Sequence, residues 1–299
     1  MSLGRKRNME DILMSRTIKF IIGQEEAEYT AHSSSLTVLS QSLQSIIDHG
    51  YPHEMEETVI WKDVEPSTFV NLMEHAYPGD YNIPELSKRP TWSRVARKVD
   101  RKTHIHPIVA VTTRGEKSTD EIEEPSSLYR WMLRVSGKRS RRQESSAQYK
   151  FCQQHFSLET AASQTAVNES SPASEAWLKD IRRQHRTGYK IVFETHANLY
   201  MIASKFGITE LRGLCIHRIR LSLLHAPSTN EVAAAVLHTT RVVYDKTNLG
   251  DPLRSLLVKF CITDMEWMMR EEGGGRIAPL LRSVPGFAAD LLLEIPHDD

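Results

Sequence analysis

Near its start, the chain alternates apolar and polar residues with a period of two. In TIKFII, residues 17–22, every second residue is a large apolar one, so these side chains lie on one face of an extended segment. Gly23 offers a turn, and the period of two returns in AEYTA, residues 27–31. This pattern predicts a β-hairpin.

The residues after the hairpin change to a helical period. The serines of residues 33–35 can cap the apolar run that follows, which predicts helices over residues 36–39 and 43–47. Thr58–Trp61 then has the composition of a short strand. Together these segments predict a small α/β unit.

A further helix is predicted to begin at Pro66, because the first helical turn does not need the N–H that proline lacks. Its apolar residues recur at i, i+3, i+4 and i+7 and so share one face: Phe69, Leu72, Met73 and Ala76. Pro78-Gly79 ends this helix.

Residues 85–190 lose this regularity and mix charge runs with stretches rich in Ser and Pro, as in SQTAVNESSPASEA. The segment holds 21 basic against 12 acidic residues, a net charge of +9, whereas the whole chain is balanced at 38 of each. We expect a basic, largely disordered insert between two folded regions.

From about residue 191 to residue 295, helical periodicity dominates. Ser228-x-x-Glu231 has the spacing of a capping box, and Asp251-Pro252 pairs a good N-cap residue with a proline in the first turn. The sequence therefore predicts an α+β fold, in which a small sheet with a hairpin is surrounded by helices and followed by an all-α region. The expected segments are an N-terminal tail (1–16), a core (17–84), the insert (85–190) and a C-terminal helical region (191–295).

Two motifs of the core resemble those of the BTB/POZ domain. The first is the spacing of four residues across the hairpin–helix junction: His32, Leu36, Ser40 and Leu43. The second joins a strand, an acidic turn, a helix begun by proline and an aromatic-x-Gly-Asp-Tyr ending, and its residues are Asp63, Phe69, Tyr77, Gly79 and Tyr81. HANLYMIASKFGITELRGLCIHRI is similar to the helical pair that follows the core in fungal BTB proteins. The resemblance covers residues 12–84 and 194–295.

The residues alone predict structural roles for the first motif. His32 would bond the backbone with one ring nitrogen, while Leu36 and Leu43 would bury against the hairpin. The resemblance implies a non-enzymatic protein-interaction module that associates with itself or with other proteins. One implied partner is the scaffold of a cullin-type ubiquitin ligase, for which the chain would be a substrate adaptor. The candidate partner-binding residues are Phe69, Leu72, Met73, His196, Tyr200 and Leu211.

An alternative function rests on the basic run KRSRR. Its four cations, Lys138, Arg139, Arg141 and Arg142, have the composition of a nuclear-import signal or a phosphate-binding patch. The chain would then be a nuclear regulatory or scaffold protein. A solvated charge run is the simpler interpretation, and the nearby Tyr129 and Trp131 do not interleave with the cations as a base-stacking surface would. Nucleic-acid binding is therefore not favoured.

The remaining features limit the chemistry. With 40% hydrophobic and 25% charged residues, the composition is that of a soluble globular protein, and neither a membrane span nor a secretion signal is apparent. We therefore expect a cytoplasmic or nuclear protein. The three cysteines are far apart, and Cys152-x-x-His155 is only half of a zinc-site pattern. Since no phosphate-binding or nucleophile motif occurs, we expect no catalytic residue, metal, cofactor or small-molecule substrate.

Overall fold

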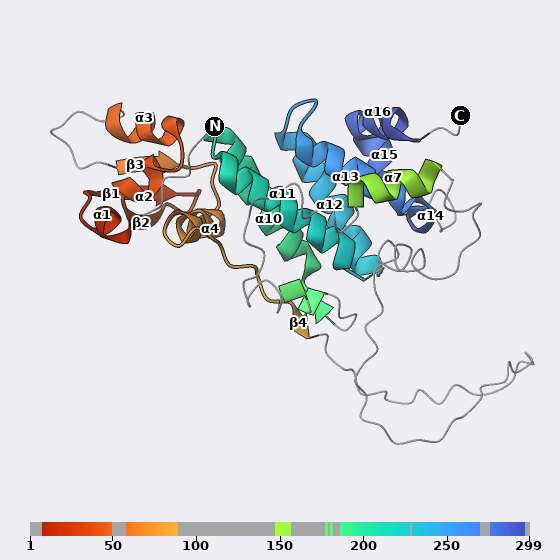
Figure 1. Ribbon diagram of the computed structural model, residues 1–299, viewed down its shortest axis with the longest axis horizontal. Helices are drawn as coiled ribbons and strands as arrows, with labels where there is room; N and C mark the ends of the chain where they lie inside the picture. Colours follow the sequence, from red (N-terminus) through yellow and green to blue (C-terminus); the bar gives the residue numbers. More distant parts are fainter. Residues whose placement is uncertain are drawn as a thin grey trace, which may run out of the picture.

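An α/β unit and a helical array make up the part of the chain that the computed structural model describes, which is residues 8–49, 58–88, 147–156, 177–178, 180–181, 186–227, 229–269 and 276–296 (Figure 1). The α/β unit comprises α1 (Met9–Leu13), β1 (Thr17–Ile22), β2 (Ala27–His32), α2 (Ser33–Thr37), α3 (Gln41–His49), β3 (Thr58–Trp61) and α4 (Pro66–Ala76). The array comprises α7 (Ala147–Phe156), α10 (Tyr189–Lys205), α11 (Thr209–His225), α12 (Asn230–Lys246), α13 (Pro252–Thr263), α14 (Met265–Met268), α15 (Ala278–Ser283) and α16 (Pro285–Glu294). The short strands β4 (Ser87–Lys88) and β5 (Arg186–Thr187) pair antiparallel between the two groups.

The sheet of the α/β unit has the order β2-β1-β3. β1 runs antiparallel to β2, with Ile18 opposite Ala31 and Phe20 opposite Tyr29, and parallel to β3. The predicted hairpin and the strand Thr58–Trp61 are both confirmed. Gly23 takes φ +75° in the turn, a conformation that residues with a side chain rarely adopt. Because β1 lies in the centre, β2 keeps one edge that pairs with no described strand.

Helix α4 covers one face of this sheet with the predicted apolar stripe. Phe69 is fully buried, and its ring centroid lies 5.1 Å from that of Phe20 on β1 and 5.1 Å from that of Tyr29 on β2. The helix begins at Pro66 and ends at Ala76, as the sequence predicted. Burial of Phe69 against two strands therefore fixes the position of α4 on the sheet.

The caps of α2 and α3 differ from the prediction. The serines expected to precede a helix lie inside α2, where Ser35 donates a hydrogen bond through its hydroxyl to the His32 carbonyl oxygen at 2.7 Å. Ser40 instead supplies the capping hydroxyl, which accepts from the Leu43 N–H in the first turn of α3 at 3.1 Å. The prediction that the serines of residues 33–35 cap a helix is therefore wrong, and the serine that caps, Ser40, was not predicted to do so.

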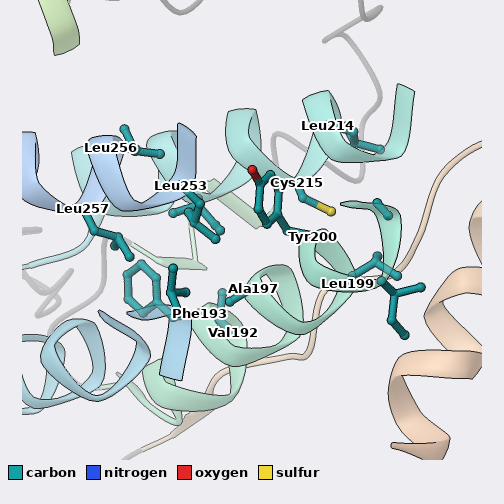
Figure 2. Packing of buried hydrophobic residues seen from close by; sticks show 14 of the residues in the cluster. Val192, Phe193, Ala197, Leu199, Tyr200, Leu214, Cys215, Leu253, Leu256 and Leu257 are labelled. Carbon is teal, nitrogen blue, oxygen red and sulfur yellow. The ribbon is translucent and has the colours of Figure 1, made fainter. Parts of the chain in front are cut away.

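Helix α10 is the centre of the helical array and packs against α11 and α12. Figure 2 shows how its Phe193 and Tyr200 meet Cys215 of α11 and Leu253 of α13 in one apolar cluster. Asp251 caps α13 by accepting from the Leu253 N–H at 2.8 Å, and it also accepts from the Tyr200 hydroxyl at 3.0 Å. The predicted Asp251-Pro252 start is confirmed, and its carboxylate joins two helices.

The structure describes ordered elements inside the segment predicted to be irregular. α7 lies at residues 147–156, and its Phe151, Cys152 and Phe156 are buried. The Phe156 ring centroid lies 6.3 Å from that of Phe260 on α13. β5 and the start of α10 also precede residue 191, so the helical region begins earlier than predicted. Residues 89–146 and 157–176, with the basic run Lys138–Arg142, lie outside the described residues.

The predicted capping box at the start of α12 was wrong in its residues. Thr229 is the N-cap and accepts from the Val232 N–H at 3.2 Å. Glu231 reaches another helix, where its carboxylate accepts from the Gly188 N–H at the start of α10 at 2.8 Å. A glutamate in a first helical turn thus bonds the N-terminus of a neighbouring helix.

Two contacts join the α/β unit to the helical array beside the β3–α4 turn. The Trp61 ring of β3 stacks on the Phe206 ring at the end of α10, with centroids 4.6 Å apart. Lys205 donates to the Asp63 carboxylate at 2.6 Å, and this hydrogen bond holds the pKa of Asp63 below its ordinary value. Both charged side chains are largely exposed, so the apolar stacking stabilises the junction more than the ion pair does.

The position of Phe69 generates a stability prediction. Phe69→Ala should lower the free energy of unfolding by about 3–5 kcal/mol, because it removes a fully buried ring and leaves a cavity between α4 and the sheet. The matched control is the neighbouring Val70→Ala, which truncates an exposed side chain and should change stability by less than about 0.5 kcal/mol. Urea denaturation followed by circular dichroism measures both, and equal effects would contradict this packing.

Candidate functional site

His32 and Tyr77, two of the motif residues, bond each other at the end of β2. The Tyr77 hydroxyl accepts from the His32 backbone N–H at 3.1 Å and lies 2.8 Å from His32 Nδ1. The second contact is a hydrogen bond between the hydroxyl and the imidazole ring. The predicted partner of the imidazole, the backbone, is therefore corrected: the ring bonds a side chain of the α4 C-terminus.

The other motif residues have structural positions. Leu36, Leu43 and Phe69 are fully buried, Ser40 caps α3, and Asp63 bonds Lys205. Gly79 takes φ +93° in the loop after α4. Tyr81 is buried and bonds His196 of α10 and Arg218 of α11. These residues build the framework on which an accessible site can form.

An accessible apolar hollow lies between β2 and α4 and has a volume of about 380 Å³. We call it the β2–α4 groove, and the described residues that line it are Tyr29, Thr30, Ala31, Phe69, Val70, Met73, Glu74, Tyr77 and Pro78. Val70 is 40% exposed, while Tyr29, Met73 and Tyr77 are partly buried. The groove therefore offers apolar surface that none of the described residues covers.

The residues predicted to bind partners separate into two groups. Five of them have at most 1% exposure and belong to the core: Phe69, Leu72, His196, Tyr200 and Leu211. They cannot touch a partner in this structure, with the partial exception of Phe69, whose ring forms the floor of the groove. Met73 alone combines a place in the groove wall with partial exposure. The helical stripe had identified the buried face of α4 rather than the face that a partner can reach.

Glu74 is the only charged side chain among the described residues that line the β2–α4 groove. Its carboxylate accepts from the Asn82 N–H at 2.8 Å and from the Asn82 side-chain amide at 2.9 Å. Both donors are neutral, so the negative charge of Glu74 is not compensated by them. The apolar groove thus carries one negative charge at the end where Tyr77 lies.

The groove residues that sequence reasoning missed had a weak signal. Val70 follows Phe69 but lies outside the apolar stripe of α4. It is therefore an apolar residue on the outer face of the helix, where it does not contribute to the core. Tyr29 shares the inward face of the hairpin, but it sits on the strand at the edge of the sheet. Only the strand order, which the sequence does not reveal, places these two side chains in one groove.

A larger hollow of about 600 Å³, the junction cavity, lies where the loop after α4 passes over α11. Its described lining includes Tyr81 and Trp177 together with two ion pairs, Arg218–Asp80 and Arg186–Asp180, each with an N–O distance of 2.6 Å. No serine, threonine, cysteine or histidine is among the described residues that line it. Both of its guanidinium groups bond carboxylates, and the described lining also includes the charged residues Glu85 and Lys88.

Arg218 holds the loop of the junction cavity against α11. Its side chain is 8% exposed and donates to the Tyr81 carbonyl oxygen and to the Asp80 carboxylate, both at 2.6 Å. The guanidinium carbon also lies 4.2 Å from the centre of the Tyr81 ring, a cation–π contact. An arginine in the buried stripe that includes Leu211 and Leu214 was a signal of this role that the periodicity analysis passed over.

His196 completes this Arg218 cluster from α10. Its Nδ1 lies 2.8 Å from the Tyr81 hydroxyl, and the imidazole is fully buried. Burial, with a smaller effect of the Arg218 charge, lowers the pKa of His196 to about 3, so the ring is neutral at physiological pH. Burial likewise raises the pKa of Tyr81 well above its ordinary value. Both groups keep their neutral forms and act as hydrogen-bonding partners.

The three cysteines of the chain all lie among the described residues. Cys152, Cys215 and Cys261 are buried, and burial raises the pKa of each thiol to about 12, which removes the nucleophilic thiolate. Among the residues that the structure describes, no group of His, Cys, Asp and Glu side chains could hold a metal ion. Nor does any helix in this part of the chain have the length and apolar character required to cross a membrane.

Comparisons of this chain with protein-family models, with curated proteins and with solved structures gave no match.

The buried imidazole generates a prediction on acid stability. Because the pKa of His196 is about 3 in the folded chain and 6.5 when unperturbed, the unfolded chain binds a proton that the folded chain excludes between these values. Stability is therefore complete above the unfolded pKa and falls as the pH drops below it, by up to about 1.4 kcal/mol per pH unit for one group. Urea denaturation at a series of pH values measures this slope.

Two variants separate the titration of His196 from its packing. His196→Phe should be less stable at neutral pH, and its acid slope should be lower by about one proton, up to about 1.4 kcal/mol per pH unit. Tyr81→Phe, which removes the hydroxyl and keeps the imidazole buried, should retain the wild-type slope. His155, whose pKa burial lowers to about 4, contributes equally in all three proteins. A wild-type slope in His196→Phe would contradict the assignment.

Arg218 generates a further prediction. Arg218→Met keeps much of the side-chain length but leaves the Tyr81 carbonyl oxygen without this donor, which should lower the free energy of unfolding by about 1–3 kcal/mol. Arg212→Met on the exposed side of the same helix is the matched control and should change stability by less than about 0.5 kcal/mol. Thermal unfolding measures both. An Arg218→Met variant as stable as the wild type would show that the contacts of Arg218 do not stabilise the fold.

Proposed function

We propose that this chain is a non-enzymatic protein-interaction module of the BTB/POZ type, which binds partner proteins through the β2–α4 groove. The observation that carries the proposal is the groove itself, in which Tyr29, Val70, Met73 and Tyr77 offer apolar surface beside a sheet edge that pairs with no described strand. Uncovered apolar surface of this kind is typical of sites where proteins meet other proteins.

The contacts of the motif residues support the BTB/POZ type. His32 at the end of the hairpin bonds Tyr77 at the end of α4, so the first motif touches the second. Asp63 and Tyr81 of the second motif bond Lys205 and His196 of the helical region. Residues that carry the resemblance in three separate stretches of sequence thus act together in space.

The mostly apolar described lining of the β2–α4 groove supports a binding role at this site. The β2–α4 groove contains one carboxylate and no cation or thiol among its described residues, and the junction cavity contains ion pairs.

Two partners follow from the resemblance: a second copy of the chain and the scaffold of a cullin-type ubiquitin ligase. In the second case the chain would act as a substrate adaptor. The alternative of a nuclear regulatory or scaffold protein rests on Lys138–Arg142, which lie outside the described residues. It remains the alternative. Deletion of residues 89–146 separates the two functions, because it removes the basic run but none of the residues that line the groove.

The proposal predicts a complex that depends on the groove. Size-exclusion chromatography with light scattering, on the chain alone and mixed with a cullin N-terminal domain, should show a mass above that of one 34.2 kDa chain in at least one case. Val70→Asp should weaken that complex by about tenfold or more, because it places a charge among apolar residues at a desolvated contact.

Ile191→Asp is the matched control, since Ile191 is also an exposed apolar residue but lies on α10, away from the groove lining. It should leave the complex unchanged. A chain that remains monomeric and does not bind the cullin domain would overturn the proposed function. A complex that Val70→Asp leaves intact would show that association uses another surface.

A further inference from the structure

The backbone along the free edge of β2 is directed away from the sheet at alternate residues. The Gly23 N–H, directly after β1, donates to the Trp61 carbonyl oxygen of β3 at 3.0 Å. Odd-numbered residues of β1 therefore face β3, and Ile18 and Phe20 face β2. In the register of the hairpin, Ala31 and Tyr29 bond these two residues, which leaves the N–H and C=O groups of Glu28 and Thr30 pointing outward.

The contact of His32 confirms this direction and limits the open edge. His32 has the same parity as Glu28 and Thr30, and its N–H does point outward, to the Tyr77 hydroxyl at 3.1 Å. At the other end, the Glu26 N–H is held inside the turn by the Gly23 carbonyl oxygen at 3.3 Å. The outward backbone groups of Glu28 and Thr30 thus form a short open segment between two occupied ends.

The β2–α4 groove lies directly beside this open segment, because Thr30 and Ala31 line it together with Val70 and Met73 of α4. A strand that paired with Glu28 and Thr30 would extend the sheet by one position. Every second side chain of that strand would face α4, as those of Tyr29 and Ala31 do, and would cover the apolar wall. The alternate side chains would face solvent.

We infer that the groove binds its partner by strand addition: an extended segment of the partner pairs with the outer edge of β2 and inserts alternate apolar side chains between β2 and α4. This inference rests on the proposed function and names the form of the partner. The single charged residue of the described lining, Glu74, complements a lysine or arginine at the Tyr77 end of the bound segment. Backbone pairing supplies affinity, and the apolar alternation with its terminal cation supplies selectivity.

Thr30→Pro tests this inference without disrupting the sheet. Proline removes the Thr30 N–H, which points away from β1, so the β1–β2 ladder loses no hydrogen bond. The preceding residue, Tyr29, is already in the extended conformation that a following proline favours. Thr30→Val is the matched control, since it keeps the N–H and the branched shape. Circular dichroism and thermal unfolding of the full chain check that both variants fold.

The probe is a phage-displayed library of random peptides, selected on the full-length chain and followed by fluorescence polarisation with synthetic copies of the enriched peptides. We expect enriched sequences with apolar residues at every second position and a lysine or arginine near one end. Thr30→Pro should weaken their binding by at least about tenfold, while Thr30→Val should retain it. Glu74→Gln should weaken peptides that carry the terminal cation more than variants of them that lack it.

Three outcomes would overturn strand addition. The first is that enriched peptides bind Thr30→Pro as well as wild type. The second is that they carry apolar residues with the helical spacing of i, i+3 and i+4. The third is that no peptide binds specifically. The proposed function is decided separately by light scattering. A groove-dependent complex together with any of these outcomes would mean that partners bind here through another geometry.

Discussion

The buried Arg218 guanidinium is a constraint that joins the two parts of the molecule, in addition to the stack of Trp61 on Phe206. A guanidinium taken out of water must be given partners, and here the loop after α4 supplies the Tyr81 carbonyl oxygen, the Tyr81 ring and the Asp80 carboxylate. His196 on α10 adds a hydrogen bond to the Tyr81 hydroxyl. Because Asp80 and Tyr81 follow α4 by only a few residues, their attachment to α10 and α11 also fixes the C-terminus of α4.

The contacts of Arg218 with Asp80 and Tyr81 also affect the edge of the sheet. With the end of α4 fixed, the Tyr77 hydroxyl meets the backbone N–H and the ring of His32, and this pair closes one end of the free edge of β2. Phe69 holds the middle of α4 against Phe20 and Tyr29. The β2–α4 groove is the space that remains between these two attachments. Its walls are therefore held in place by the core, although Val70 remains exposed and Met73 only partly buried.

Sequence reasoning succeeded where local chemistry decides the structure. The period of two in TIKFII, the turn at Gly23, and the proline at the start of α4 each act within a few residues, and the hairpin, β3 and α4 have the predicted bounds. It failed where the partner is distant in sequence. Glu231 has the spacing of a capping box but bonds Gly188, which lies 43 residues away. α7 was missed because a short amphipathic stretch inside a basic, polar segment becomes a helix only when α13 covers its apolar side.

Five of the six residues predicted to bind partners lie in the core, for a more general reason. Apolar periodicity identifies the side of a helix that the fold buries, so Leu72, Tyr200 and Leu211 were selected by the property that makes them inaccessible. An accessible site is marked instead by apolar residues that do not fit the stripe, such as Val70, and by backbone that the sheet leaves unpaired. The first can be read from a sequence once the stripe is known. The second requires the strand order, because only the central place of β1 leaves β2 at an edge.

An open sheet edge beside an apolar groove is a liability, since any extended chain could pair with it. This edge has features that limit that risk. The turn at Glu26 and the bond between Tyr77 and His32 leave the outward groups of only Glu28 and Thr30 open. Lys19 and Glu28 form an ion pair at 2.9 Å on the solvent side, so a paired strand must tolerate charge there while offering apolar groups to Val70 on the other. An arbitrary hydrophobic segment meets only one of these requirements. The ion pair on one face and the apolar groove on the other thus favour a partner strand with alternating character.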